Sequence, residues 1–138
     1  MLSRGSLAAM FAAAGALATA HSALAQPPDC TEPLFQAQIN QCAEASYKAA
    51  DLEMRAVYDQ ALAQYREQDR RITEEDARYA NAEMLLRESQ EAWTTSSRDF
   101  CAARTQSAQG GTMGTGVRYA CLALLTRNRA EDLRLLLD

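Results

Sequence analysis

The 138-residue chain carries 18 acidic and 14 basic side chains, and its formal net charge of −4 excludes the basic surface on which nucleic-acid binding depends. Its one histidine, His21, lies in a segment that we expect to be removed on export. The mature protein then has no imidazole for Ser-His-Asp or Cys-His catalysis or for a histidine-ligated zinc. The composition therefore predicts a protein that is not an enzyme and has no catalytic residue, cofactor or metal site.

The first 25 residues have the features of a secretory signal peptide. Arg4 supplies positive charge, the run LAAMFAAAGALATA forms an apolar core, and Ala23 and Ala25 have the spacing of a cleavage site. The run is too short and alanine-rich for a bilayer span, and QPPD before Cys30 is not a lipoprotein signal. Cleavage after Ala25 leaves 13 basic and 18 acidic residues, a net charge of −5. We expect a periplasmic or secreted protein that does not insert into a membrane.

After a short lead-in with two prolines, the pattern predicts a helix over about 33–68. Small and apolar residues recur there at steps of three and four, on one face: Ala43, Tyr47, Ala50, Met54, Val57 and Ala61. The polar run DRRITEED breaks this stripe. Thr73 and Asp76 within it have the spacing of a capping box, which predicts a second helix from there to about Cys101. Its expected buried face comprises Tyr79, Ala82, Leu86, Ser89, Trp93, Ser96 and Phe100.

A third helix is predicted from near Gly116, with an apolar face that includes Val117, Cys121, Leu124, Leu125, Leu133 and Leu136. Period-two alternation never persists, so no strand is expected. Exposed faces of the first two helices carry acid–base pairs four residues apart, in the stabilising order: Asp51/Arg55, Glu74/Arg78 and Glu83/Arg87. The expected fold is all-α: a long antiparallel helical hairpin with a third, C-terminal helix at one end, forming one domain over 26–138 that disulfides clip together.

Four cysteines in a small exported chain indicate two disulfides, because the compartment is oxidising and no CxxC motif is present. Three pairings are possible. Pairing Cys30 with Cys42 and Cys101 with Cys121 closes short loops and is favoured. Antiparallel helices would also permit Cys42–Cys101 with Cys30–Cys121, and the crossed pairing comes third.

The glycine-rich run GGTMGTG, residues 110–116, raises the question of a phosphate-binding loop. A P-loop requires a preceding strand and a lysine after the last glycine, and neither is present. A turn between two disulfide-linked helices, with glycines at positive φ, is the better interpretation. We expect the turn to be exposed.

The residues that repeat a known pattern span almost the whole mature chain. They are Cys30, Asn40, Cys42, Ala43, Tyr47, Asp51, Met54, Tyr58, the run QEAW at 90–93, Cys101, the GGT run, Cys121, Leu122, Thr126 and Arg129. In order and spacing they resemble the small exported proteins similar to the N-terminal domain of lysozyme inhibitor LprI, over about 30–133. Arg98 and Asp99 lie one place later than the family's Arg-Asp pair, a rotation of about 100° on a helix.

This resemblance implies a helical, disulfide-clipped exported domain whose named activity is inhibition of lysozyme. Under that hypothesis the partner is a protein, a basic lysozyme, and the cleft is blocked by a loop that comprises Arg104, Gly110, Gly111, Thr112, Thr115 and Arg118. The alternative is a non-catalytic envelope protein or protein-binding module that uses its long helices. Their aromatic residues, which helical spacing first assigns to the core, are Tyr47, Tyr58, Tyr65, Tyr79 and Trp93.

Overall fold

The computed structural model describes residues 29–33, 35–108 and 111–137, and these residues contain helices and no strand. The elements in chain order are α1 (Gln36–Asp76), the 3-10 helix η1 (Ala77–Tyr79), α2 (Ala82–Arg104), the 3-10 helix η2 (Gln106–Ala108) and α3 (Gly114–Arg134). The all-α prediction is confirmed. The expected signal peptide, residues 1–25, lies outside the described residues, and its cleavage stays a prediction.

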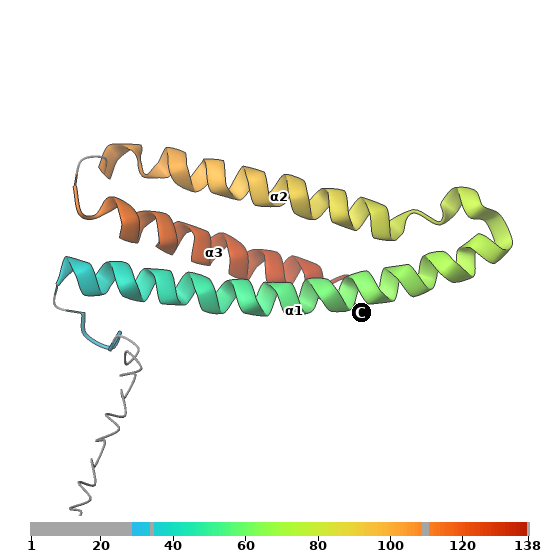
Figure 1. The fold of residues 1–138 in the computed structure, drawn as a ribbon, viewed down its shortest axis with the longest axis horizontal. Coiled ribbons are helices and arrows are strands. Elements are labelled where there is room, and N and C mark those ends of the chain that lie inside the picture. Colours follow the sequence, from blue (N-terminus) through green and yellow to red (C-terminus); the bar gives the residue numbers. More distant parts are fainter. Residues whose placement is uncertain (1–28, 34, 109–110, 138) are drawn as a thin grey trace, which may run out of the picture.

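The three long helices lie side by side, with α2 antiparallel to both α1 and α3 (Figure 1). α3 packs most extensively on α1 and runs parallel to it. It therefore does not sit at one end of the hairpin, as expected, but covers α1 along its own full length. Near the end of the chain, the Gln64 side-chain amide donates to the Leu136 carbonyl oxygen at 3.3 Å. Beyond this point α1 continues for about three turns beside the start of α2.

α1 continues through the polar run DRRITEED, so the predicted break is wrong. Arg70 inside this run pairs with Glu67 at 2.7 Å and with Glu74 at 3.7 Å, one turn on either side. The Thr73 hydroxyl donates to the Asp69 carbonyl oxygen at 2.7 Å and caps no new helix. Ion pairs at these spacings stabilise a solvated helix. The polar run ends a buried stripe without ending the helix.

The N-terminus of α2 is capped from α1. The Asp69 carboxylate accepts hydrogen bonds from the backbone N–H groups of Ala82 at 3.0 Å and Glu83 at 2.9 Å. Glu83 in turn pairs with Arg66 at 2.9 Å and Arg87 at 2.7 Å. Hydrogen bonds from Arg66 and then Arg87 lower the pKa of Glu83 to about 2. Charged side chains therefore close this end of the bundle, residues 66–87, which we call the hairpin end.

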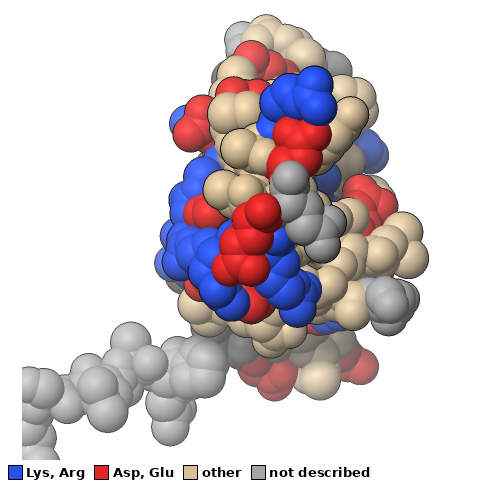
Figure 2. Space-filling model, turned by 90° about the vertical axis from the view of Figure 1, so that its right-hand side faces the viewer, with Lys and Arg blue, Asp and Glu red and all other residues tan. Residues whose placement is uncertain are grey.

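The surface of the hairpin end carries acidic and basic side chains side by side (Figure 2). Of the three predicted exposed pairs, the pair of Glu74 and Arg78 is wrong, because α1 ends at Asp76 and Arg78 pairs with Asp76 at 2.6 Å instead. The other two are present at 2.7 Å each: Asp51–Arg55 and Glu83–Arg87.

The core is a strip along α1 and α3 that α2 covers narrowly. The predicted inner face of the first helix is confirmed by four buried residues: Ala50, Met54, Val57 and Ala61. α3 adds Cys121, Leu122, Ala123, Ala130 and Leu133. The predicted face of the second helix is only partly right: Leu86 is buried and Ala82 and Trp93 are half-buried, whereas Ser89 and Ser96 are exposed, as are Tyr79 (67%) and Phe100 (57%). Leu124, expected on the inner face of the third helix, is exposed as well.

Both disulfides have the favoured local pairing. Cys30–Cys42 joins the lead-in to α1, and Cys101–Cys121 joins the end of α2 to α3. They differ in burial: Cys101 and Cys121 are in the core, whereas Cys30 is exposed. We call the end of the bundle that holds them, residues 29–47 and 101–121, the clipped end. No helix within the described ranges is long and apolar enough to span a bilayer.

Candidate functional site

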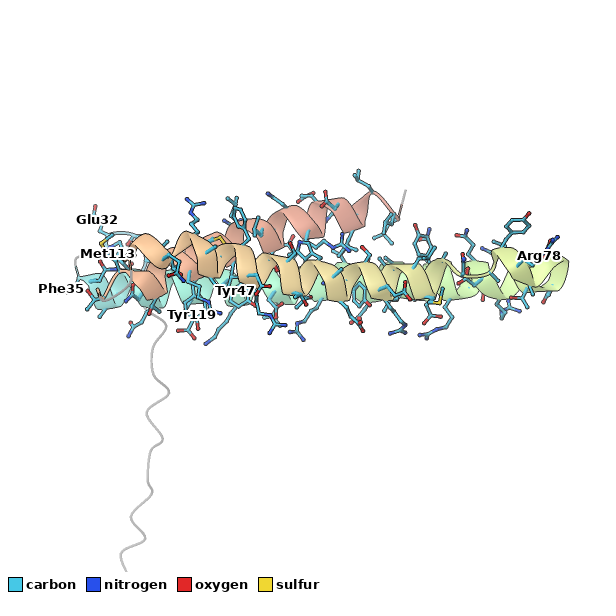
Figure 3. The ribbon with its side chains drawn as sticks, turned by 90° about the horizontal axis from the view of Figure 1, so that it is seen from above. Glu32, Phe35, Tyr47, Arg78, Met113 and Tyr119 are labelled. Carbon is cyan, nitrogen blue, oxygen red and sulfur yellow. A yellow bond between two sulfur atoms is a disulfide. The ribbon has the colours of Figure 1, made fainter. Side chains whose placement is uncertain are left out.

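The clipped end presents large apolar side chains to solvent. Phe35, which precedes α1, is 67% exposed, and Ile39 one turn later is 42% exposed. Met113, which precedes α3, is 56% exposed. Figure 3 shows Phe35 and Met113 at the same end of the molecule as Glu32, with Arg78 at the opposite end. We call these three exposed side chains, Phe35, Ile39 and Met113, the apolar tip.

The glycine-rich turn is held to α1. The Asn40 side-chain amide donates to the Thr112 carbonyl oxygen at 2.8 Å, and Gln36 donates to the Asn40 side-chain oxygen at 2.9 Å. A Cβ at Gly116 would lie 2.6 Å from that oxygen, so this glycine is required by a close approach of two helices. The turn is therefore braced against α1 at a fixed place.

The expectation of positive φ is wrong for the described glycines of the turn. Gly111, Gly114 and Gly116 have no φ in the left-handed region, and Gly114 and Gly116 belong to α3, which begins two residues earlier than predicted. Gly114 and Gly116 have ordinary helical backbone angles, so backbone freedom does not explain why these positions are glycine. Their role is the absence of a side chain, most clearly at Gly116.

The predicted loop residues lie together at the clipped end. Gly111, Thr112 and Thr115 are exposed around the turn. Arg104 in the last turn of α2 and Arg118 in α3 are also exposed. Within the described part of the chain, neither arginine has an acidic partner, in contrast to seven other basic residues, which are ion-paired: Lys48, Arg55, Arg66, Arg70, Arg78, Arg87 and Arg134. Gly110 of the predicted loop lies outside the described residues.

Next to the clipped end, a groove of about 380 Å³ runs between α1 and α2. Tyr47, Asp51, Tyr58 and Asp59 recur at helical spacing and form the α1 wall. The opposite wall comes from Trp93, Thr94, Ser97 and Arg98 of α2, and the floor from Leu122 and Thr126 of α3. The helical pattern had assigned the aromatic residues to the core, but they are only half-buried. The sequence reasoning therefore missed the groove.

A network of hydrogen bonds fixes the position of Trp93, the chain's one tryptophan. Arg129 of α3 donates to the Gln90 side-chain oxygen and to the Ser89 hydroxyl, both at 3.0 Å, and its guanidinium lies 5.9 Å from the Trp93 ring centre. The Gln90 amide contacts the Met54 sulfur at 3.2 Å. This network holds the indole between the core and the groove.

The groove carries balanced charge. Arg55 pairs with Asp51 at 2.7 Å on α1. Arg98 across the groove has no acidic partner among the described residues and donates only to the Thr94 carbonyl oxygen, at 3.4 Å. Asp59 has no basic partner there either. The groove therefore has two acidic and two basic side chains along its walls, together with aromatic rings.

The described residues contain no group of side chains suited to binding a metal ion. Groups of three or more side chains from His, Cys, Asp and Glu that could hold a metal ion do not occur in residues 29–33, 35–108 and 111–137. The cysteine sulfurs are in disulfides. What the described surfaces offer is binding through aromatic, apolar and charged side chains.

The fold is that of a small helical protein with two local disulfides, and disulfides form and persist in oxidising compartments outside the cytoplasm. The family model described as "Lysozyme inhibitor LprI" matches residues 30–133, so the chain belongs to this family. It is also 36% identical over 121 residues to an uncharacterized protein of Rhizobium meliloti (strain 1021), a match that covers 87% of each chain. The comparison with solved structures gave no match.

The residues that carried the family resemblance separate into two groups in the structure. Cys30, Cys42, Cys101, Cys121 and Asn40 brace the clipped end. Most of the others surround the groove or its supporting network: Tyr47, Asp51, Met54, Tyr58, Gln90, Trp93, Leu122, Thr126 and Arg129. Of the shifted Arg-Asp pair, Arg98 lines the groove and Asp99 is exposed outside it.

Proposed function

We propose that this protein is exported by cleavage after Ala25 into the periplasm or the medium, and that it inhibits lysozyme without catalysis by inserting its clipped end into the enzyme's cleft. The observation that carries the proposal is the exposed apolar tip of Phe35, Ile39 and Met113, flanked by Arg104 and Arg118. Family membership supplies the class of partner.

The chemistry of the tip suits that cleft. Lysozyme works with two carboxyl groups at the bottom of a substrate-binding cleft. Arg104 and Arg118 have no acidic partner in the described structure and supply guanidinium donors for carboxylates. Met113 and Phe35 supply apolar surface that contact with a partner would remove from water.

The tip is also held rigid before binding. Two disulfides and the hydrogen bond from Asn40 to Thr112 fix the starts of α1 and α3 relative to the end of α2. A preorganised tip loses less conformational entropy on binding than a free loop. The net charge of −5 after export adds attraction to a basic lysozyme at long range, an effect that salt screens.

The test is inhibition of cell-wall lysis by animal-type and bacterial lysozymes, titrated with the oxidised mature protein. We expect stoichiometric inhibition of at least one lysozyme, weaker in high salt. The double variant Arg104→Gln/Arg118→Gln is expected to weaken inhibition about tenfold or more. Arg71→Gln is the control for the loss of a positive charge elsewhere, because Arg71 is an exposed arginine at the opposite end without an ion pair among the described residues.

Equal loss of inhibition in both variants would show that the clipped end is not the surface that recognises the enzyme. No inhibition by a folded, oxidised sample would contradict the proposal altogether. The non-catalytic envelope protein that binds a protein partner through its helices is then the better description.

A further inference from the structure

We propose that the groove between α1 and α2 is a second binding site, and that its ligand is a short, uncharged saccharide. The site lies next to the clipped end and shares Tyr47 with it, but the inference does not depend on lysozyme inhibition. Its volume of about 380 Å³ is in the range of small-molecule sites.

The first argument concerns the available hydrogen-bonding groups. Both walls are α-helices, so their backbone N–H and C=O groups are used within the helices. A ligand must therefore be met by side chains, and a peptide strand cannot add to these walls through its backbone. The side chains outside an ion pair include a carboxylate at Asp59, a guanidinium at Arg98 and a hydroxyl at Thr94. Carboxylates and guanidinium groups bind pairs of neighbouring hydroxyls with two hydrogen bonds each.

The second argument concerns the rings. Tyr47 and Tyr58 on one wall and Trp93 on the other are half-buried, so each keeps part of its ring accessible from the groove. Tyr47 also stacks on Tyr119 with ring centres 5.8 Å apart, which fixes its orientation. Fixed aromatic rings bind the apolar faces of flat ligands at low cost in conformational entropy. A sugar ring combines such a face with hydroxyl groups at its rim.

The third argument concerns charge. Asp51 and Asp59 balance Arg55 and Arg98, so the groove does not select a cation or an anion. An amphipathic helix is also a poor occupant, because its apolar face would strand these four charged groups away from water. An uncharged, polyhydroxylated ligand satisfies both conditions.

The experiment follows the emission of Trp93 in the full oxidised protein, because the single indole lies in the groove wall. The probes are tri-N-acetylglucosamine and cellotriose. We expect a saturable change in emission with a Kd on the order of 0.1–1 mM for one of them. Asp59→Asn is expected to weaken binding about fivefold or more, since a carboxylate that accepts from hydroxyls is lost. Asp132→Asn, an exposed acid of α3 outside the groove, is the matched control and is expected to bind as the parent does.

NMR spectra of backbone and indole amides supply a second readout if the emission does not change. No saturable change in either signal up to about 10 mM saccharide overturns the proposal. Equal weakening by Asp59→Asn and Asp132→Asn overturns the assignment to the groove. A helical peptide that saturates the Trp93 signal while both saccharides fail assigns the groove to a protein partner instead. Because Asp59 lies outside the clipped end, Asp59→Asn is expected to leave lysozyme inhibition unchanged, so the two proposals fail independently.

Discussion

At the clipped end, two disulfides and the close approach of Gly116 to Asn40 hold the helices, whereas at the hairpin end the same task falls to charged side chains around Asp69 and Glu83. The first kind of fastening is insensitive to salt and pH and is broken by reduction. The second is exposed to solvent, is screened by salt and depends on protonation. A surface that must keep its shape when salt or pH changes is better placed at the end that disulfides hold. This favours the clipped end as the binding surface.

The largest expected effect separates the two disulfides. The chain-entropy model assigns roughly 3 kcal/mol to each, because the loops of 12 and 20 residues are similar in length. Cys101–Cys121 is also buried in the core, whereas Cys30–Cys42 fastens an exposed lead-in. We expect the double replacement Cys101→Ser/Cys121→Ser to lower the free energy of unfolding by about 4 kcal/mol. We expect only about 1 kcal/mol for Cys30→Ser/Cys42→Ser, because the released lead-in gains chain entropy in the folded state as well as in the unfolded state. Urea unfolding measures both, and equal losses would mean that burial adds nothing to loop closure.

The hairpin end is tested by its cap. Asp69→Ala removes the acceptor of the Ala82 and Glu83 N–H groups and is expected to cost about 1–2 kcal/mol. Thr73→Ala is the control, because its hydroxyl bonds only within α1 and caps no helix end. It is expected to change stability by less than about 0.5 kcal/mol. A larger loss of stability in Thr73→Ala than in Asp69→Ala would instead support the capping box that the sequence predicted at Thr73.

Two glycines of the clipped end test whether the close approach of α3 to Asn40 stabilises the fold. Gly116→Ala places a methyl group 2.6 Å from the Asn40 side-chain oxygen and displaces the amide that holds Thr112. We expect a net loss of about 1 kcal/mol after the gain in helix propensity. At Gly114 the nearest atom is the Ala108 carbonyl oxygen, 3.4 Å away, so Gly114→Ala is expected to be neutral within about 0.5 kcal/mol. Thermal unfolding distinguishes the two, and a stabilising Gly116→Ala would show that the close approach is not needed.

The smallest expected effect is the response of the hairpin end to acid. The pKa of Glu83 is lowered from 4.5 to about 2 by Arg66 and Arg87, so its contribution to stability is complete above about pH 4.5 and is lost as the pH falls through about 2. We expect Glu83→Gln to flatten the dependence of Tm on pH in that window. Glu88→Gln, at an exposed acid without an ion pair among the described residues, is the control. If Tm depended on pH equally in both variants, Glu83 would not be the cause of the acid response.

The features that could be predicted from the sequence are those that depend on interactions between residues close together in the chain. The inner face of α1 was predictable because Ala50, Met54, Val57 and Ala61 repeat at helical spacing. The disulfide pairing was also predictable, since short loops favour it. The cap of α2 was not, because its acceptor Asp69 lies 13 residues before the helix begins. A local capping signal at Thr73 was therefore read as the start of the helix.

The candidate surfaces were predictable only in part. The exposure of Arg104 and Arg118 beside the turn follows from turn residues and charge, whereas the apolar tip depends on Phe35 and Met113, which are distant in sequence. The groove was missed for a different reason. Helical spacing shows which side chains share a face, but not whether a neighbouring helix fills the space in front of it. Tyr58 faces a gap there because α2 packs loosely over α1.

The local disulfide pairing has a consequence for the covalent connectivity of the molecule. Neither bridge crosses the turn between α1 and α2: one joins residues 30 and 42, and the other joins residues 101 and 121. A protease cut at the turn near Tyr79, which is 67% exposed, would therefore yield two separately cross-linked pieces held together only by noncovalent contacts. Such pieces would migrate as two bands on a non-reducing gel.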